Sequence, residues 1–227
     1  MGLLNFRKPK WQHKDPAVRL KSIDSIDPLE TEVLAGLSLE DQDRQVRLAA
    51  INRLTDLATL DQLAPDTDPQ DLPFITARKD QLRYDLVINA PDINTCRDDL
   101  SQITSPELLA NLAVNSGHPE IRLAAVLGID DQLLLASIVE QNCGKEPARV
   151  AMAKINGEEL LNRLAKNAAS KTARRLATTK LAAIERQRQQ PDQKELQDQT
   201  WLSVADEQTH QLTSGNIDPA AGRLPAM

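Results

Sequence analysis

The stretch from Pro106 to Ser116 reads PELLANLAVNS, and its apolar pattern returns twice at intervals of 26 residues. The later copies read DQLLLASIVEQ at 131–141 and EELLNRLAKNA at 158–168. Three register positions carry the pattern: Leu108, Leu134 and Leu160; Leu109, Leu135 and Leu161; Leu112, Ile138 and Leu164. A fixed period of this length is typical of helical-repeat proteins, in which each unit buries its apolar face against its neighbours.

A second sequence motif lies between these stretches and carries one arginine in each unit. It reads PEIRLAA at 119–125 and PARVAMA at 147–153, and earlier versions are PAVRLK at 16–21 and RQVRLAA at 44–50. The arginines that mark it are Arg19, Arg47, Arg97, Arg122, Arg149 and Arg174. They are separated by 28, 50, 25, 27 and 25 residues, so the gap of 50 predicts a degenerate unit near Phe74–Arg83. We therefore expect about seven units between residues 15 and 188.

Prolines mark several of the predicted helix starts. Each proline is expected in the first turn of a helix, where the backbone N–H groups have no intrahelical partner and proline therefore costs no hydrogen bond. The pairs are Asp15-Pro16, Asp27-Pro28, Ser105-Pro106, His118-Pro119 and Glu146-Pro147. Asp27 and Glu30 also fit a capping box. Apolar residues recur at helical spacing, and no segment alternates convincingly with period two. The sequence thus predicts an all-α fold, a right-handed α-solenoid of about seven short two-helix repeats over residues 15–188.

Segments of different composition flank the predicted array. Residues 1–14 form a basic leader, in which we expect Trp11 to pack over the first unit as a cap. From residue 189 to 227 the chain is polar, so we predict a largely disordered tail. Trp201, Leu202 and Val204 form its one apolar cluster. We expect this cluster to dock on the last unit, and a short partner-binding motif is the alternative.

Composition limits the kind of core and the kind of ligand. Of the 227 residues, 41% are hydrophobic but only 2% are aromatic, so the core must be aliphatic. Scarce aromatic residues also argue against a stacking platform for single-stranded nucleic acid. No apolar run approaches the roughly 20 residues that a membrane span requires. The two cysteines, Cys96 and Cys143, are far apart in sequence, which favours a reducing cytoplasm.

Charge is distributed unevenly along the chain. The net charge is −6, but residues 1–22 carry +5, residues 23–143 carry −14 and residues 144–188 carry +7. The basic block could follow a phosphate backbone, or it could be a solvated outer face. Its candidate binding face comprises Lys145, Arg149, Lys154, Arg163, Lys166, Lys171, Arg174, Arg175 and Lys180. An acidic body with basic ends also suggests polarised binding or head-to-tail contact between molecules.

The recurring arginine has two possible roles. One arginine per unit most simply forms an internal ladder, in which each guanidinium bonds a carboxylate or a carbonyl of the adjacent unit. Asp15, Asp43 and Glu120, which lie just upstream of three of the arginines, are candidate partners. Contact with a ligand is the alternative.

Motifs for catalysis or cofactor binding are missing from the sequence. It contains no HExxH motif, no paired CxxC motif, no EF-hand loop and no Gly-rich phosphate loop. The three histidines are scattered, and we expect His118 to cap a helix. We expect Cys143 to be an inert thiol, with a reactive thiol as the less favoured alternative. The sequence therefore predicts no catalytic residue, no metal site and no cofactor.

The phrase Asp/His-Pro-x-x-Val/Ile-Arg-Leu-x-Ala resembles the second-helix signature of HEAT-like repeats. The opening stretch FRKPKWQHKDPAVRL, at 6–20, resembles the start of long proteobacterial proteins that carry the domain of unknown function 349. The resemblance implies a helical array over roughly residues 6–188. The long coiled-coil-like helices that follow the array in that family are absent here, as in a fragment or a shortened relative. The family has no assigned reaction, so the resemblance implies a fold and no chemistry.

These observations lead to three functional hypotheses. We expect a non-catalytic helical-repeat scaffold that mediates protein–protein interaction in a bacterial cytoplasm. The first alternative is a nucleic-acid or ribosome-associated protein that binds through the basic block and the basic N-terminus. The second is a HEAT-like enzyme, such as a bilin lyase or a base-removing glycosylase. Such an enzyme would need pocket-lining aromatic residues and a suitably placed carboxylate or thiol.

Overall fold

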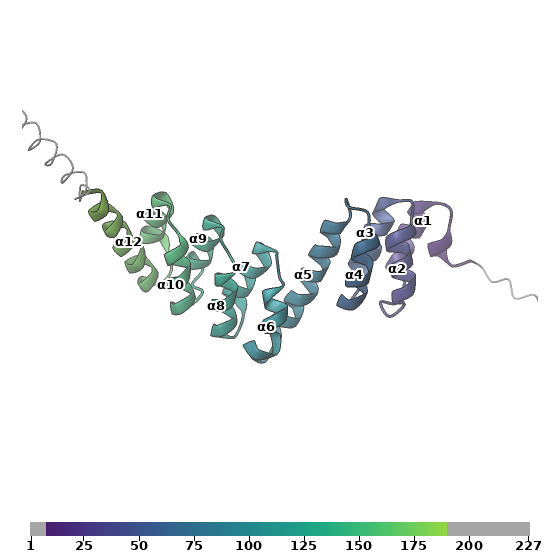
Figure 1. Ribbon diagram of the computed structural model, residues 1–227, viewed down its shortest axis with the longest axis horizontal. Helices are drawn as coiled ribbons and strands as arrows, with labels where there is room; N and C mark the ends of the chain where they lie inside the picture. Colours follow the sequence, from purple (N-terminus) through teal and green to yellow (C-terminus); the bar gives the residue numbers. More distant parts are fainter. Residues whose placement is uncertain (1–7, 190–227) are drawn as a thin grey trace, which may run out of the picture. The chain divides into compact units, whose positions relative to one another are not determined.

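The computed structural model describes residues 8–189, and within that range the chain is helical and contains no strand (Figure 1). The all-α prediction is therefore confirmed for the described residues. The elements are η1 (Lys10–Gln12), α1 (Pro16–Ile23), α2 (Thr31–Glu40), α3 (Arg44–Arg53), α4 (Leu57–Leu63), η2 (Ala64–Asp66), α5 (Leu72–Ile88), α6 (Ile93–Ser101), α7 (Pro106–Asn115), α8 (Pro119–Leu127), α9 (Gln132–Glu140), α10 (Lys145–Lys154), α11 (Glu158–Asn167) and α12 (Lys171–Gln189).

The described chain divides inside α12 into two compact units. The first unit ends at Ala177 and contains all the helices from α1 to α11, and the second begins at Thr178. The predicted boundary of the array at residue 188 stays a prediction. The predicted tail and its apolar cluster at Trp201 lie outside the described residues. None of the described helices is long and apolar enough to cross a membrane.

The helices of the first unit pack in two rows. Row A contains α2, α4, α7, α9 and α11, and row B contains α1, α3, α6, α8 and α10. Helices contact a neighbour in the same row, as α7 and α9 do, and a partner in the other row, as α7 and α8 do. Each contact therefore joins elements that are close in sequence, as in repeat architectures.

Two of the three register positions that define the 26-residue period form the core between the rows, and the third, with Leu108, Leu134 and Leu160, is only partly buried. Leu109, Leu135 and Leu161 are at most 5% exposed, and Leu112 and Leu164 are fully buried. Burying one such side chain contributes roughly 1.5–3 kcal/mol. At the other end of the unit, Trp11 packs against the core cluster that includes Ile23 and Leu34, in the position expected of a cap.

Several helix starts lie where the prolines predict them. The side chains of Asp15 and Ser105 cap α1 and α7, each with proline directly after the cap. His118 is the N-cap residue of α8, but its side chain makes no capping bond.

One predicted start is wrong. The Asp27 side chain accepts a hydrogen bond from the Leu29 backbone N–H in a turn, and α2 begins only at Thr31. The polar side chain of Asp27 stabilises the turn instead of a capping box. Pro147 does lie in the first turn of α10, as its third residue, because Gly144 (φ 103°) turns the chain into a helix that begins at Lys145.

The predicted degenerate unit is a single helix of 17 residues, α5. Its first half packs beside α3 and α4, where Arg78 Nε donates to the Leu54 carbonyl at 2.8 Å. Its second half packs beside α6 and α7, where the Tyr84 hydroxyl donates to Asn111 Oδ1 at 2.7 Å. The first half of α5 therefore continues row B, and the second half continues row A.

We expect Arg83→Leu to raise the free energy of unfolding by about 1 kcal/mol. Arg83 lies 26 residues before Leu109, is only 7% exposed, and has a buried Nε without a hydrogen-bond partner. Leucine would fill the same position without burying a charge, and Gln102, which accepts from Arg83 Nη2, is exposed and can return to water. Urea denaturation followed by circular dichroism measures the change. Arg78→Leu is the control with the opposite expected sign, because it removes the donor to the buried Leu54 carbonyl.

Candidate functional site

Four of the repeat arginines share one hydrogen bond. In each, Nη1 donates to the backbone carbonyl six residues earlier, at a distance between 2.5 and 3.0 Å. The pairs are Arg19 with His13, Arg47 with Asp41, Arg122 with Ser116, and Arg174 with Ala168. Each guanidinium thereby ties a row B helix, or the first turn of α12, to the loop that precedes it.

Arg97 and Arg149 do not make this bond, although the sequence pattern groups them with the other four. Arg97 lies five residues after its N-cap, Asp92, whereas Arg19 lies four residues after Asp15. The extra residue rotates the side chain about 100° around the helix, away from the loop. Arg97 instead lines a groove between α6 and α8, and the exposed Arg149 pairs with Glu146 at 2.9 Å.

Two of the arginines also bind a carboxylate of the following unit. Arg19 binds both oxygens of Asp41, at 2.7 and 2.6 Å. Arg47 Nε donates to Asp71 Oδ2, and Arg44 Nε donates to Asp71 Oδ1, both at 2.8 Å. The candidate partners upstream have another role, because the side chains of Asp15 and Asp43 cap α1 and α3.

The pKa values of these buried carboxylates are lowered. Burial alone would raise the pKa of Asp41, but the hydrogen bonds from Arg19 and the Asp43 backbone, together with the charges of Arg19 and Arg47, outweigh it and lower the pKa below the usual Asp value. The same balance lowers the pKa of Asp71, where burial is opposed by Arg44 and Arg47. Both carboxylates are therefore ionised at neutral pH and hold their arginines as structural ion pairs.

The two cysteines are buried in separate places, Cys96 in α6 and Cys143 in the turn between α9 and α10. Cys96 is 3% exposed and Cys143 is 1% exposed. Burial raises the pKa of both thiols above the usual cysteine value. Both are therefore protonated at neutral pH, and a protonated thiol is a poor nucleophile. Among the described residues, no three potential metal ligands lie together.

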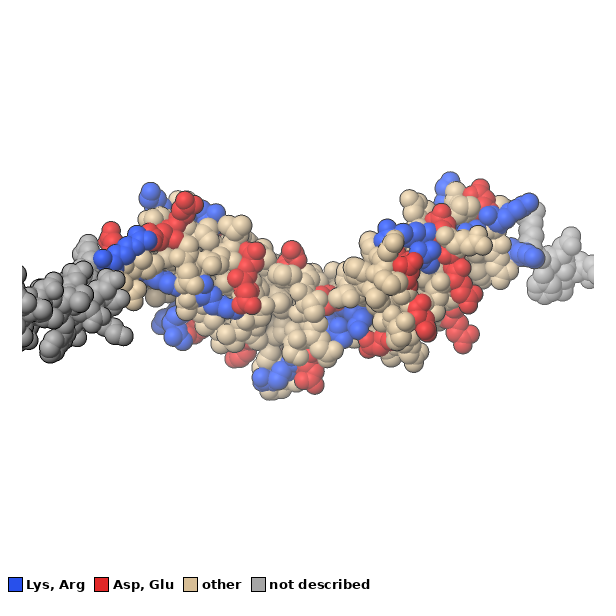
Figure 2. All heavy atoms as spheres, turned by 45° about the horizontal axis from the view of Figure 1, so that its top comes forward, with Lys and Arg blue, Asp and Glu red and all other residues tan. Residues whose placement is uncertain are grey.

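Several members of the predicted basic face are used inside the fold. Lys154 Nζ donates to the carbonyl of Leu127 at 2.9 Å and pairs with Asp130 at 2.8 Å. Arg163 pairs with Glu140 at 2.8 Å. The exposed members in the first unit are Lys145, Arg149, Lys166, Lys171 and Arg175. Lys180 belongs to the second unit. On the face shown in Figure 2, basic and acidic side chains are interspersed and do not merge into one basic surface.

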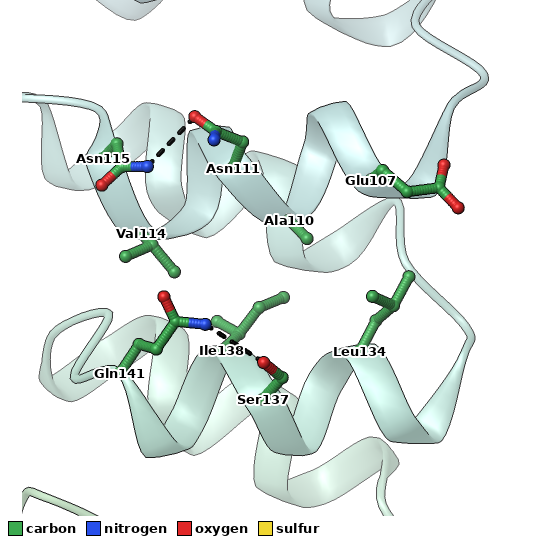
Figure 3. Close-up of a pocket in the computed structure, with 9 residues that line it drawn as sticks. All are labelled: Glu107, Ala110, Asn111, Val114, Asn115, Leu134, Ser137, Ile138 and Gln141. Atoms are coloured by element: carbon green, nitrogen blue, oxygen red, sulfur yellow. Dashed lines mark hydrogen bonds between the residues drawn. The ribbon is translucent and has the colours of Figure 1, made fainter.

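A groove of about 220 Å³ lies on the row A surface between α7 and α9 (Figure 3). Its lining residues are Glu107, Ala110, Asn111, Val114 and Asn115 from α7, and Leu134, Ser137, Ile138 and Gln141 from α9. The groove therefore has a short apolar floor and a rim of polar side chains that carry no positive charge.

The polar rim is ordered by hydrogen bonds within each helix. Asn115 Nδ2 donates to Asn111 Oδ1 at 3.1 Å, and Gln141 Nε2 donates to Ser137 Oγ at 3.1 Å. Asn115 and Gln141 lie at the same end of the groove, on opposite sides of it (Figure 3). Their carbonyl oxygens accept no hydrogen bond from the described residues. The groove thus presents two hydrogen-bond acceptors beside a patch of aliphatic side chains.

These two carboxamides belong to a longer row with the same 26-residue period. The row consists of Asn89, Asn115, Gln141 and Asn167, at the C-terminal ends of α5, α7, α9 and α11. All four side chains are exposed. We call this set the carboxamide row. The leucine and arginine patterns do not reveal this row, although its 26-residue spacing is present in the sequence.

Comparisons with known proteins find no match to this chain. No protein-family model matches it, and no curated protein or solved structure matches it significantly. The groove and the carboxamide row are therefore interpreted from their own geometry.

Proposed function

We propose that this protein is a non-catalytic binding scaffold, a right-handed α-solenoid of about seven HEAT-like repeats. It captures a partner protein in a bacterial cytoplasm. The observation that carries the proposal is the groove between α7 and α9, which has an aliphatic floor and a polar, ordered rim. Protein ligands suit such a surface, because they offer apolar side chains to the floor and hydrogen-bonding groups to the rim.

The charges of the structure favour a protein ligand over a nucleic acid. Lys154, Arg163 and Arg174, three members of the predicted basic face, hold carbonyls or carboxylates of neighbouring segments. They are therefore less available to phosphates. The groove itself contains Glu107, which would repel a phosphate backbone.

Photocrosslinking tests the proposal in living bacteria. We would place p-benzoylphenylalanine at position 110, in the groove, or at position 120, an exposed position on α8 in row B. We expect discrete protein adducts from position 110, unchanged by nuclease, and none of the same adducts from position 120. Adducts that disappear with nuclease would contradict the proposal. They would favour nucleic-acid binding if Lys145→Glu, Lys166→Glu and Lys171→Glu together also abolished them.

A further inference from the structure

In the described chain, cationic side chains cross three of the contacts between consecutive row B helices, which we call seams. In each, the side chain donates to the backbone carbonyl that lies 11 residues after the N-cap of the preceding helix, at a distance between 2.5 and 2.8 Å. The pairs are Arg53 with Ile26, Arg78 with Leu54, and Lys154 with Ile129. All three donors are half-buried, so their aliphatic stems lie along the seam while the charged group reaches the carbonyl.

Within the same range, the seam between α6 and α8 has no such cation. Its accepting position is Ile103, 11 residues after the N-cap Asp92, and no described residue donates to the Ile103 carbonyl. Gly128 occupies the donor position, since it lies 10 residues after the N-cap of α8, as Arg53 and Lys154 do in α3 and α10. Its φ of −77° lies in the right-handed helical region, so the backbone does not require glycine here. Gly128 instead lines a groove of about 300 Å³, where a longer side chain would cross the seam.

The groove combines an aliphatic floor with one positive charge. Its lining residues are Ile93, Arg97, Leu100, Ser101, Ile103, Leu109, Ala124 and Gly128. Of these described residues only Arg97 is charged, and the neighbouring Asp98 and Asp99 do not line the groove. The Arg97 side chain is exposed, forms no ion pair within the described chain, and makes only a long hydrogen bond of 3.4 Å to Asn94 Oδ1. Its guanidinium is therefore available to an anion and would repel a second cation.

Size and chemistry together indicate the class of ligand. A groove of about 300 Å³ holds about ten groups of the size of water, at roughly 30 Å³ each. The floor favours an aliphatic group, Arg97 favours a carboxylate, and the Ile103 carbonyl lacks the N–H donor that its equivalents have. A free α-amino acid with an aliphatic side chain carries all of these groups on one carbon atom and is of this size.

We propose that the groove between α6 and α8 binds a free aliphatic α-amino acid, such as leucine. The carboxylate pairs with Arg97, and the ammonium group donates to the Ile103 carbonyl. The aliphatic side chain lies on Leu100 and Leu109, so the ligand occupies the place that the Lys154 side chain takes in the next seam. The site opens between row B helices and is separate from the row A groove of the proposed scaffold. The protein would thus bind a small molecule independently of its partner.

Isothermal titration calorimetry of the full-length protein with leucine tests the proposal. We expect a dissociation constant of about 0.1–1 mM, as suits a ligand of this size. Gly128→Lys should abolish binding, because the new side chain would fill the groove and reach the Ile103 carbonyl as Lys154 reaches Ile129. The matched control is Gly117→Lys, which adds the same side chain at an exposed position before α8 and should bind leucine as the wild type does.

Further comparisons test each charged contact, and they decide the proposal even if Gly128→Lys does not fold. Arg97→Gln should weaken leucine binding about tenfold. Arg149→Gln, at the matching position five residues after the N-cap of α10, lies outside the groove and should leave binding unchanged. N-acetyl-leucine, which lacks the ammonium group, and leucinamide, which lacks the carboxylate, should each bind about tenfold more weakly than leucine.

Three results would overturn the inference. The first is no heat of binding with leucine up to about 10 mM. The second is equal affinity of leucine for the wild type and for Gly128→Lys or Arg97→Gln. The third is equal affinity of the wild type for leucine and for either analogue. None of these results bears on the scaffold proposal, which the crosslinks from position 110 test separately.

Discussion

Replacing Asp71 by alanine is expected to lower the free energy of unfolding by about 3–5 kcal/mol. The carboxylate is fully buried and holds Arg44 and Arg47 at 2.8 Å each. The Arg47 side chain is only 16% exposed, so without Asp71 its charge would stay partly buried and unpaired. Removing one partner of a buried ion pair is strongly destabilising, because the remaining charge is left buried without compensation. Replacing the whole pair by apolar residues of similar size would cost far less.

Urea denaturation of the full chain measures this loss, and hydrogen exchange shows where it acts. Because helices contact only close neighbours, faster exchange should be concentrated in α3, α4 and α5. Asp61→Ala is the control, because Asp61 pairs with Lys79 but its side chain is 56% exposed. Its removal should change the free energy of unfolding by less than about 1 kcal/mol. Equal losses in the two variants would show that Asp71 does not act as a buried partner.

Asp80→Ala is expected to cost about 3 kcal/mol, for a different reason. Asp80 is 2% exposed, and its Oδ2 accepts hydrogen bonds from Thr104 N at 3.0 Å, Thr104 Oγ1 at 2.8 Å and Ser105 N at 2.8 Å. The side chain thus satisfies two backbone donors in the loop between α6 and α7. Alanine would leave these donors without a partner in a partly buried place, which costs their full desolvation.

The same denaturation assay tests Asp80, with Asp85→Ala as its control on the same helix. Asp85 is exposed and its carboxylate accepts from Gln81 Nε2 of the same helix, at 2.9 Å, so its loss should cost about 0.5 kcal/mol or less. Asp80→Asn retains an acceptor and should lie between the wild type and Asp80→Ala. If Asp80→Ala unfolded at the same urea concentration as Asp85→Ala, the loop would not depend on this carboxylate.

Local signals in the sequence predict the helices well. Apolar spacing identifies the α7, α9 and α11 segments, and Asp15 and Ser105 mark true helix caps. Proline alone was misleading at residue 28, because proline fits a turn before a helix as well as the first turn of the helix itself. The switch of α5 between rows could not be predicted, since it depends on which neighbours the two halves meet.

The partners of buried charges were harder to predict than the helices. Proximity in sequence favours carboxylates just upstream of the arginines, whereas Asp41 lies 22 residues after Arg19 and Asp71 lies 24 residues after Arg47. Asp80 and Thr104 are likewise 24 residues apart. These separations are close to one repeat, because stacking brings each loop beside the loop of the next unit. The carboxamide row has the same origin, and a search for polar residues at the apolar period would have found it.

The long helix α5 sets a limit on how such a chain can grow. Duplicating or deleting one 26-residue module in the segment from α7 to α11 leaves every other helix in its own row and changes the length of the carboxamide row by one step. Copying α5 alone would instead add a single helix, and every helix after it would run in the opposite direction. Selection could therefore adjust the length of the carboxamide row on the C-terminal side of α5 by whole two-helix modules, but not by copies of α5.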